Sequence, residues 1–250
     1  MEKPYEKELT VSYYETDANE ALTLQNVVKY LMETAVGHTE DAGYTIEKLA
    51  SENLGWVVLN WVIRIYSYPV YKEKLRLCTW AKPGSSLQAT RYFKIKNEKD
   101  EVICEVVSRW ALLDLVNRHP VRFSDAMNEA YCCAEAAPFE PDSFNPAKEN
   151  PENLVSERKT VVRRSETDTN GHTNNTVYIE WATNDVPDDI YLNYRAEEIK
   201  VLYRNECHEG NEVYIKTYKE EKEDKILMIT SMTNAENKVL CKMSSEWRKK

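Results

Sequence analysis

Apolar and polar positions follow two different periods along the chain, and the two periods succeed one another in a fixed order. Residues 24–41 carry apolar side chains at spacings of three and four, which predicts an amphipathic helix. Thr23 precedes this run and Gly43 follows it, as is typical of residues at the two ends of a helix. Near-alternation predicts one strand before the helix and four after it. These strands are residues 9–14, 55–68, 74–81, 87–97 and 101–114.

The second half of the chain repeats this order of elements. A strand is predicted at residues 158–164, and a helix at about residues 174–183. The strands predicted after this helix are residues 199–206, 212–219, 226–233 and 238–247. Each half therefore holds one helix among mostly antiparallel strands, and that helix must bury its apolar stripe against the sheet.

Short stretches of sequence repeat together with the elements. The sequence ETDAN at residues 15–19 recurs as ETDTN at residues 166–170, 151 positions later. Residues 102–110 and 239–247, 137 positions apart, share a Val-x-Cys pattern and a Ser-x-Trp pattern. Because each match falls at the corresponding element of an ordered series, we predict an internal duplication.

A polar stretch divides the two halves. Residues 134–152 include four prolines and are rich in Glu, Asp and Asn, which is typical of an interdomain linker. We therefore predict a first domain at residues 1–133 and a second domain at residues 153–250.

Composition disfavours several classes of function. The 250-residue chain has a net charge of −9, which speaks against nucleic acid as the main partner. It has six glycines and no glycine-rich phosphate-binding motif, so we expect no nucleotide and no other cofactor. No apolar run approaches the roughly 20 residues that span a bilayer, and the first residues show no signal or transit segment. With six scattered cysteines and no C-x-x-C motif, the chain is predicted to be cytoplasmic with reduced thiols.

The densest group of chemically active side chains lies at the start of the second predicted helix. Asp168, Asn170 and His172 are spaced by two, so an extended or looping backbone presents all three on one side. Such a group can bind a carbonyl, hold a water molecule and move a proton. In the first copy Ala21 stands at the position of His172, although the polar turn is kept. The fold therefore does not require the imidazole, and we predict that His172 is catalytic.

Two segments carry a resemblance to a known family. They are DTNGHTNN at residues 168–175, followed by Tyr178, Ile179 and Trp181, and YRNEC at residues 203–207. Together they resemble the active-site motif and the Arg-Arg-Glu-Cys segment of the acyl-ACP thioesterases, plant and bacterial enzymes that release fatty acids from acyl carrier protein. Two positions depart from the family pattern without removing a catalytic group. They are Thr173, where valine is usual, and Asn205, where the second arginine would stand.

The resemblance implies an α+β fold of the tandem, or double, hotdog type, in which two antiparallel sheets each wrap around one long helix. The first hotdog, residues 1–133, would then be degenerate and supply the pocket for the acyl chain, and residues 153–250 would be catalytic. The implied partner is acyl carrier protein carrying a fatty acyl chain, and either a monomer or a homodimer would be competent. Because the plastid transit peptide of the plant enzymes is absent, a bacterial cytoplasmic form is implied.

Thioester hydrolysis needs an activated nucleophile and hydrogen-bond donors for the oxyanion. We expect His172 to act as a base, because an imidazole titrates near neutral pH. Asn170 would fix the water or the carbonyl, and Asp168 would either orient the imidazole or hold the loop. Free backbone N–H groups at the start of the second helix are natural donors for the oxyanion.

Glu206 and Cys207 give two rival mechanisms. In one, Glu206 and His172 activate a water molecule, and in the other Cys207 attacks as a thiolate with His172 and Asn170. Neighbours on a regular strand point to opposite faces, and Cys207 shares parity with apolar residues. We favour the water mechanism, since hydrolysis needs no covalent intermediate.

Four further residues are candidates for substrate binding. Asn174 and Asn175 follow the catalytic cluster, with helix capping as the alternative role. Trp56 and Trp61 are candidates for contact with the acyl chain, with ordinary core packing as the alternative.

The other histidines, His38, His119 and His208, are expected to be structural or solvated. No metal is expected, because Cys207-His208 and Cys132-Cys133 lack a recognisable zinc spacing. Two other functions remain open, a hotdog acyl-CoA thioesterase with the same site and a non-catalytic hotdog module that binds an acyl chain or a carrier protein.

Overall fold

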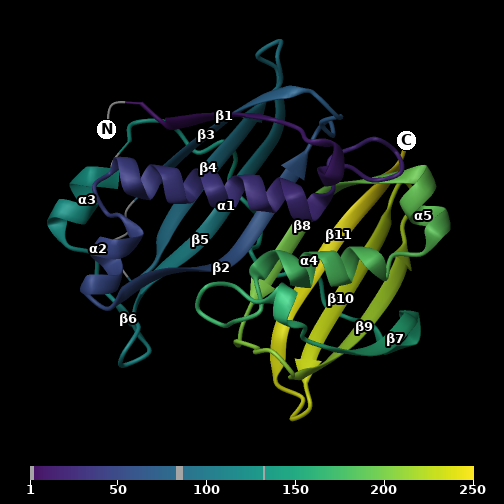
Figure 1. The fold of residues 1–250 in the computed structure, drawn as a ribbon. Helices are drawn as coiled ribbons and strands as arrows, with labels where there is room; N and C mark the ends of the chain where they lie inside the picture. The colour runs from purple at the N-terminus through teal and green to yellow at the C-terminus, as the bar shows by residue number, and fades with distance from the viewer. Residues whose placement is uncertain (1–2, 83–86, 132) are drawn as a thin grey trace. The chain divides into compact units, whose positions relative to one another are not determined.

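The computed structural model describes residues 3–82, 87–131 and 133–250, and these fall into two compact units (Figure 1). Unit 1 comprises Met1–Trp61 with Ile65–Asp142, and unit 2 comprises Val62–Arg64 with Ser143–Lys250. Residues 83–86, between the strands predicted at residues 74–81 and 87–97, and Cys132 of the adjacent cysteine pair lie outside the described residues.

Unit 1 consists of an antiparallel sheet and three helices. Its strands are β1 (Tyr5–Thr10), β2 (Leu54–Ile65), β3 (Lys74–Lys82), β4 (Ala89–Lys96), β5 (Val102–Asp114) and β6 (His119–Val121). Its α-helices are α1 (Leu24–Asp41), α2 (Ile46–Ser51) and α3 (Asp125–Tyr131), and a 3₁₀ turn, η1 (Tyr13–Glu15), follows β1. The order in the sheet is β1-β3-β4-β5-β2, and β6 pairs with β5.

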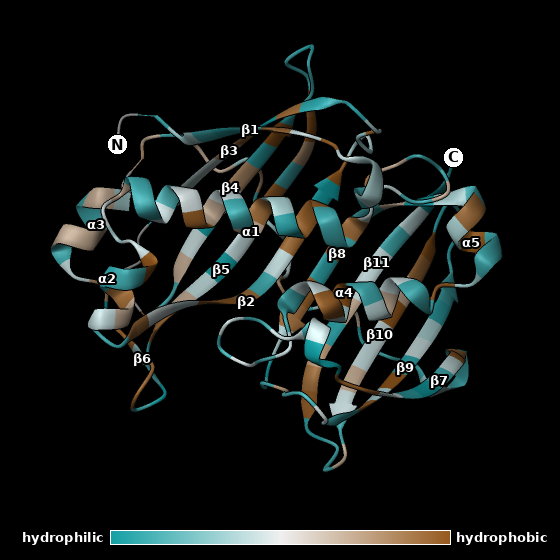
Figure 2. Cartoon of the chain, viewed as in Figure 1, coloured by the Kyte–Doolittle hydropathy of each residue, from teal (hydrophilic) through white to brown (hydrophobic). Residues whose placement is uncertain are grey.

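Helix α1 lies across one face of this sheet and contacts β1 and β3 (Figure 1). Apolar and polar residues alternate along it as a helical stripe requires (Figure 2), and Val28 and Leu31 are completely buried. Gly43 has a φ of +80° and its N–H donates to the Glu40 carbonyl, which ends the helix. Thr23 occupies the N-cap position, but its hydroxyl has no hydrogen-bond partner among the described residues.

Unit 2 repeats the plan with a shorter helix. Its strands are β7 (Leu154–Val161), β8 (Tyr194–Tyr203), β9 (Glu212–Glu221), β10 (Ile226–Asn234) and β11 (Val239–Lys249). Its helices are α4 (Asn175–Asn184) and α5 (Asp188–Asn193), with 3₁₀ turns η2 (Pro151–Asn153) and η3 (Arg164–Glu166). The strand order is β8-β11-β10-β9-β7, all antiparallel, and α4 contacts β11.

The order of the predicted elements, the mixed α+β class and the antiparallel sheets are confirmed. The prediction of one helix in each half was wrong, because α2, α3 and α5, and also the strand β6, were not predicted. Several bounds were wrong as well. The first strand was predicted at residues 9–14, but β1 ends at Thr10 and the following residues form η1. The reason is local, because the Glu15 carboxylate accepts a hydrogen bond from the Ser12 N–H at 2.8 Å and closes the turn. The same turn, η3, shortens the strand predicted at residues 158–164. The second helix, α4, has 10 residues against 18 in α1, so it is not a long helix.

The repeated Ser-x-Trp pattern adopts the same local structure in both units. The indole N–H of Trp110 in β5 donates to the Ser108 hydroxyl at 2.8 Å, and the indole N–H of Trp247 in β11 donates to the Ser245 hydroxyl at 2.8 Å. All four side chains are buried, so each unit satisfies a core indole in the same way. Within residues 3–82, 87–131 and 133–250, every helix is too short or too polar to cross a bilayer.

Candidate active site

A tight polar turn between η3 and α4 holds His172. The Asp168 carboxylate accepts hydrogen bonds from the N–H groups of Asn170 at 2.8 Å and of His172 at 3.1 Å. The Asp168 N–H in turn donates to the His172 carbonyl at 2.8 Å, and Gly171 supplies the positive φ of +75° that the turn needs. Asp168 therefore fixes the backbone of His172. The side chain of Asn170 is exposed and has no hydrogen-bond partner among the described residues.

The start of α4 follows at once. Asn174 is the N-cap, and its side-chain oxygen accepts from the N–H of Thr176 at 3.0 Å and from the Thr176 hydroxyl at 2.8 Å. These are the bonds of a helix cap, so the predicted substrate contact of Asn174 stays a prediction. Asn175 is the first helical residue, and its N–H makes no hydrogen bond to a described residue. That N–H is a donor at the positive end of the helix dipole.

A second loop, after β8, lies beside this turn. The Cys207 carbonyl accepts from the N–H of Thr173 at 2.7 Å and from the Thr173 hydroxyl at 3.0 Å. One residue further on, His208 forms an isolated antiparallel bridge with His172. These backbone contacts bring the residues around position 206 to the turn that holds His172.

His172 and Glu206 are neighbours in space. The His172 Nε2 lies 3.5 Å from a Glu206 carboxylate oxygen, and the two side chains are 28% and 41% exposed, so water reaches both. The two residues of the predicted water mechanism are thus in contact, and their catalytic role stays a prediction. An imidazole and a carboxylate at this distance can together take a proton from a water molecule held between or beside them.

Cys207 is buried, with 1% of its surface exposed, whereas Glu206 is exposed. Burial raises the pKa of the Cys207 thiol, which disfavours the thiolate. Its sulfur lies 3.8 Å from the Asn211 side-chain oxygen. As predicted, Cys207 lies in the apolar interior and Glu206 does not. Strand parity is not the reason, because β8 ends at Tyr203 and the two residues lie in the loop that follows it.

Sequence reasoning missed His208. Its ring centroid lies 5.0 Å from that of His172, and one ligand atom from each of His172, Glu206 and His208 lies within 4.8 Å of the others. These three side chains could hold a metal ion. The only sequence signal was the position of His208 two residues after Glu206, which says nothing about the backbone bridge to His172.

Trp56 and Trp61 lie in unit 1 on β2. Trp61 is completely buried, and its ring packs against Phe93 and Trp110. Trp56 is half-buried and its ring centroid lies 5.3 Å from that of Phe123. Both therefore belong to the packed interior, and their contact with an acyl chain stays a prediction.

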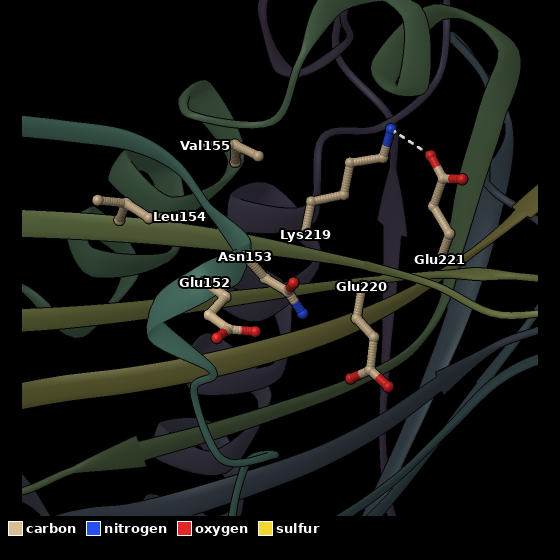
Figure 3. A pocket seen from close by; sticks show the side chains of 7 residues that line it. All are labelled: Glu152, Asn153, Leu154, Val155, Lys219, Glu220 and Glu221. Atoms are coloured by element: carbon tan, nitrogen blue, oxygen red, sulfur yellow. Dashed lines mark ion pairs between the residues drawn. The ribbon is translucent and has the colours of Figure 1, made fainter.

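A pocket of about 400 Å³ opens on unit 2, where η2 and β7 meet the end of β9 (Figure 3). Its lining is Glu152, Asn153, Leu154, Val155, Lys219, Glu220 and Glu221. Lys219 pairs with Glu221 at 2.7 Å. The lining is strongly charged and contains none of the predicted site residues, so it does not suit an acyl chain.

Comparison with known protein families finds matches over nearly the whole chain. The model of the acyl-ACP thioesterase N-terminal domain matches residues 2–131, and the model of the acyl-ACP thioesterase C-terminal domain matches residues 149–249. The family resemblance read from the two motifs is thus confirmed.

Individual proteins are similar at lower identity. An oleoyl-acyl carrier protein thioesterase 2 of Arabidopsis thaliana chloroplasts is 26% identical over 223 residues, which are 83% of this chain and 60% of that protein. The chain spans 60% to 64% of the first curated relatives it matches. The solved structure of an acyl-ACP thioesterase from Bacteroides thetaiotaomicron has a TM-score of 0.86 at 24% identity, with 97% of both chains covered. A 12:0-ACP thioesterase from Umbellularia californica has a TM-score of 0.87 at 18% identity, with 98% of this chain and 94% of that chain covered. These structures show that the fold is shared.

Proposed function

The chain belongs to the acyl-ACP thioesterase family, and we propose that it hydrolyses the thioester of fatty acyl-ACP to free fatty acid and acyl carrier protein. The observation that carries the proposal is the contact of the His172 imidazole with the Glu206 carboxylate at 3.5 Å. We further propose that the two units are tandem hotdogs, that the first binds the acyl chain and that the second performs the chemistry. The matching plan of sheet and helix in the two units supports this division.

In the proposed reaction, His172 and Glu206 activate a water molecule. The water gives up a proton to this pair, and its oxygen attacks the carbonyl carbon of the thioester. The carbonyl oxygen becomes an oxyanion, collapse of the tetrahedral intermediate breaks the carbon–sulfur bond, and the proton passes to the leaving sulfur. The products are a carboxylic acid and the thiol of the carrier, so atoms and charge balance.

Two groups would hold the reacting atoms. The N–H of Asn175 points out of the first turn of α4 without a partner among the described residues, and we propose it as the oxyanion donor. The exposed amide of Asn170 would position the water or the carbonyl. Asn174 would act as the helix cap that aligns these donors.

The rival route through Cys207 has less support. A nucleophilic thiol must ionise, and burial raises the pKa of this one. The carbonyl of the same residue receives two hydrogen bonds from Thr173, which gives Cys207 a structural role in joining the two loops. We therefore propose Cys207 as a supporting residue.

Binding of acyl carrier protein, which is acidic, calls for basic side chains near the site. Several basic residues of unit 2 are already paired, such as Arg158 with Asp185 and Lys159 with Glu212. Arg204 is exposed, makes no ion pair with a described residue and lies two positions before Glu206. We propose Arg204 as a contact for the carrier.

The function is tested by measuring free-acid release from acyl-ACP and acyl-CoA thioesters that carry the same set of fatty acyl groups. We expect hydrolysis of acyl-ACP at a much higher kcat/KM than of acyl-CoA, and a loss of that preference in Arg204→Glu. Efficient use of acyl-CoA would instead identify an acyl-CoA thioesterase. No release from any substrate, with binding retained, would identify a non-catalytic acyl-binding module and overturn the proposal.

Two variants separate the mechanisms. Glu206→Gln should lower kcat by roughly a hundredfold or more, whereas Cys207→Ser should keep most of the activity. The opposite pattern would establish the thiolate route.

Asn170→Ala should lower kcat by roughly tenfold to a hundredfold, because it removes the amide proposed to position the water or the carbonyl. Its matched control is Asn19→Ala, at the corresponding turn position of unit 1, which should leave kcat unchanged.

A further inference from the structure

Three metal-ligating side chains converge at the proposed catalytic pair. One ligand atom from each of His172, Glu206 and His208 lies within 4.8 Å of the others. Ligand atoms around a tetrahedral Zn²⁺ with bonds of about 2.0–2.2 Å lie roughly 3.4 Å apart. The His172 Nε2 and the Glu206 oxygen, at 3.5 Å, already have this separation. The separations that involve His208 are at most 4.8 Å, so a side-chain rotation that brings them to roughly 3.4 Å would complete three sites of a tetrahedron.

A hydrogen bond prepares His208 for this role. Its Nδ1 lies 3.2 Å from the Gly171 carbonyl oxygen. A carbonyl can only accept, so Nδ1 carries the proton and a neutral His208 presents a lone pair on Nε2. Metal-bound histidines usually donate their other ring N–H to a carbonyl or carboxylate in this way. The backbone bridge between His172 and His208 keeps the two imidazoles side by side.

The ligand set selects the kind of ion. Two imidazoles and one carboxylate suit Zn²⁺ and its neighbours in the first transition row, whereas Mg²⁺ and Ca²⁺ prefer oxygen ligands throughout. All three side chains are partly or largely exposed, so an ion has direct access and keeps coordination positions for water. The thiol of Cys207 is buried, with 1% of its surface exposed, and is not among the converging ligand atoms.

Unit 1 shows that the fold does not need this trio. Its Ala21 and Val70 form the isolated bridge that corresponds to His172 and His208. The Pro69 carbonyl accepts from the Leu22 N–H at 2.8 Å, as the Cys207 carbonyl accepts from Thr173, which places Tyr68 at the position of Glu206. An alanine, a tyrosine and a valine therefore fill the three positions in a backbone of the same design.

We infer that His172, Glu206 and His208 form a binding site for a divalent transition-metal ion of the Zn²⁺ type, and that the bound ion reversibly blocks hydrolysis. The ion would occupy the lone pairs of His172 and Glu206 that must take a proton from water. It thus acts as an inhibitor of this site, and this second part rests on the proposed function. His208 serves the ion alone and does not enter the proposed reaction.

Metal binding is tested on the full chain by calorimetric titration with Zn²⁺, with Co²⁺ as a spectroscopic probe. The wild type should bind one ion at this site, and His208→Ala should bind it at least roughly tenfold more weakly. His119→Ala, which removes an exposed histidine of unit 1, is the matched control and should bind as the wild type does. Equal Zn²⁺ affinity in all three proteins, no binding to the wild type, or a thiolate-to-cobalt charge-transfer band would overturn the site.

Inhibition is tested separately by free-acid release with and without Zn²⁺. The wild type should lose activity and recover it when EDTA is added, and His208→Ala should need at least roughly tenfold more Zn²⁺ for the same loss. Full activity with Zn²⁺ bound would overturn the blocking role. A chain that binds Zn²⁺ through His208 yet hydrolyses no thioester would retain the metal site and disprove the proposed function, so the two failures are distinct.

Discussion

The polar turn of unit 1 and the polar turn of unit 2 have nearly the same backbone and different chemistry. In unit 1 the Asp17 carboxylate accepts from the N–H groups of Asn19 at 2.8 Å and Ala21 at 3.3 Å. In unit 2 Asp168 makes the corresponding bonds at 2.8 and 3.1 Å. The reverse bond, from the aspartate N–H to the carbonyl four residues later, measures 2.9 Å in unit 1 and 2.8 Å in unit 2. The turn is therefore a scaffold that does not depend on what it displays.

The glutamate that opens each turn is also used in the same way. Glu15 accepts from the Ser12 N–H at 2.8 Å and from the Tyr30 hydroxyl at 2.5 Å. Glu166 accepts from the Arg163 N–H at 2.7 Å, and the Trp181 indole N–H donates to it at 3.3 Å. Both partners on the helix lie 15 residues after the glutamate. The repeated sequence thus marks a structural device, and the proposed catalytic pair, His172 and Glu206, has no counterpart in the first copy, where Ala21 and Tyr68 stand.

The largest effect we predict comes from making unit 2 resemble unit 1 at its key position. His172→Ala places in the second turn the residue that Ala21 supplies in the first, and it removes the proposed base. We expect kcat/KM for acyl-ACP to fall by about 10²–10⁴-fold, the range that general acid–base catalysis supplies. Free-acid release measured at limiting substrate gives kcat/KM, and the same measurement at saturating substrate gives kcat.

The same variant tests whether the scaffold is independent of the imidazole. Because unit 1 forms its turn with alanine, the free energy of unfolding of His172→Ala should stay within about 0.5 kcal/mol of the wild type. Urea denaturation followed by circular dichroism gives this value. Wild-type activity in a well-folded His172→Ala would exclude the imidazole from catalysis.

The second prediction compares the imidazoles of the two units. His38 of α1 is buried, and its Nδ1 accepts a hydrogen bond from the buried Arg91 guanidinium at 2.7 Å. Burial, and then the charge of Arg91, lower the pKa of His38 to about 3. A protonated His38 would lose this bond and place two positive charges together. His172 instead lies beside the Glu206 carboxylate, and its side chain is partly exposed to solvent.

The sign of the pH effect follows from these states. His38 stays neutral in the native protein and takes up a proton in the unfolded chain below about pH 6.5. Stability is therefore fully present above that pH and is lost as pH falls toward the folded pKa, by about 1.4 kcal/mol per pH unit for this one group. Urea denaturation at pH 7, 6, 5 and 4 should show this loss in the wild type and in His119→Ala. His38→Gln should show a shallower dependence, and an identical slope would refute the assignment.

The sequence alone allowed some elements of the fold and of the candidate site to be predicted, and not others. The helix at residues 24–41 was predicted at its observed bounds, because its apolar stripe is long and Gly43 ends it. Helices α2, α3 and α5 have only six or seven residues, too few to show a helical period. The Asp168-x-Asn170-x-His172 cluster was visible because its members are close in sequence.

The partners of that cluster were harder to derive from the residues alone. The motif resemblance pointed to Glu206, but its distance to His172 depends on the bond from Thr173 to the Cys207 carbonyl. His208 was assigned no role, because its place beside His172 arises from a backbone bridge between distant segments. A one-dimensional pattern carries no record of such loop pairing, and tertiary structure alone supplies it.

The third prediction concerns two variants, each of which lacks the aspartate of one polar turn. Asp17→Ala and Asp168→Ala each take an acceptor from two backbone N–H groups, so each should lower the free energy of unfolding by about 1–2 kcal/mol. Urea denaturation of the two variants, measured side by side, tests whether the scaffold roles are equal. Asp17→Ala should leave kcat unchanged. If Asp168→Ala lost activity without losing stability, its carboxylate would act on the chemistry directly instead of holding the loop.

The smallest predicted effects concern the one turn position with a positive φ. Gly171 has a φ of +75°, and no atom lies within 4 Å of a Cβ added there, so Gly171→Ala should cost about 1 kcal/mol from backbone strain alone. The corresponding residue of unit 1, Glu20, is exposed and already bears this strain at a φ of 60°. Glu20→Gly should therefore stabilise the protein by less than about 1 kcal/mol, since the gain is offset by the greater freedom of glycine in the unfolded chain. Thermal and urea denaturation of both variants measure the pair, and changes of the same sign would show that the two turns are not equivalent.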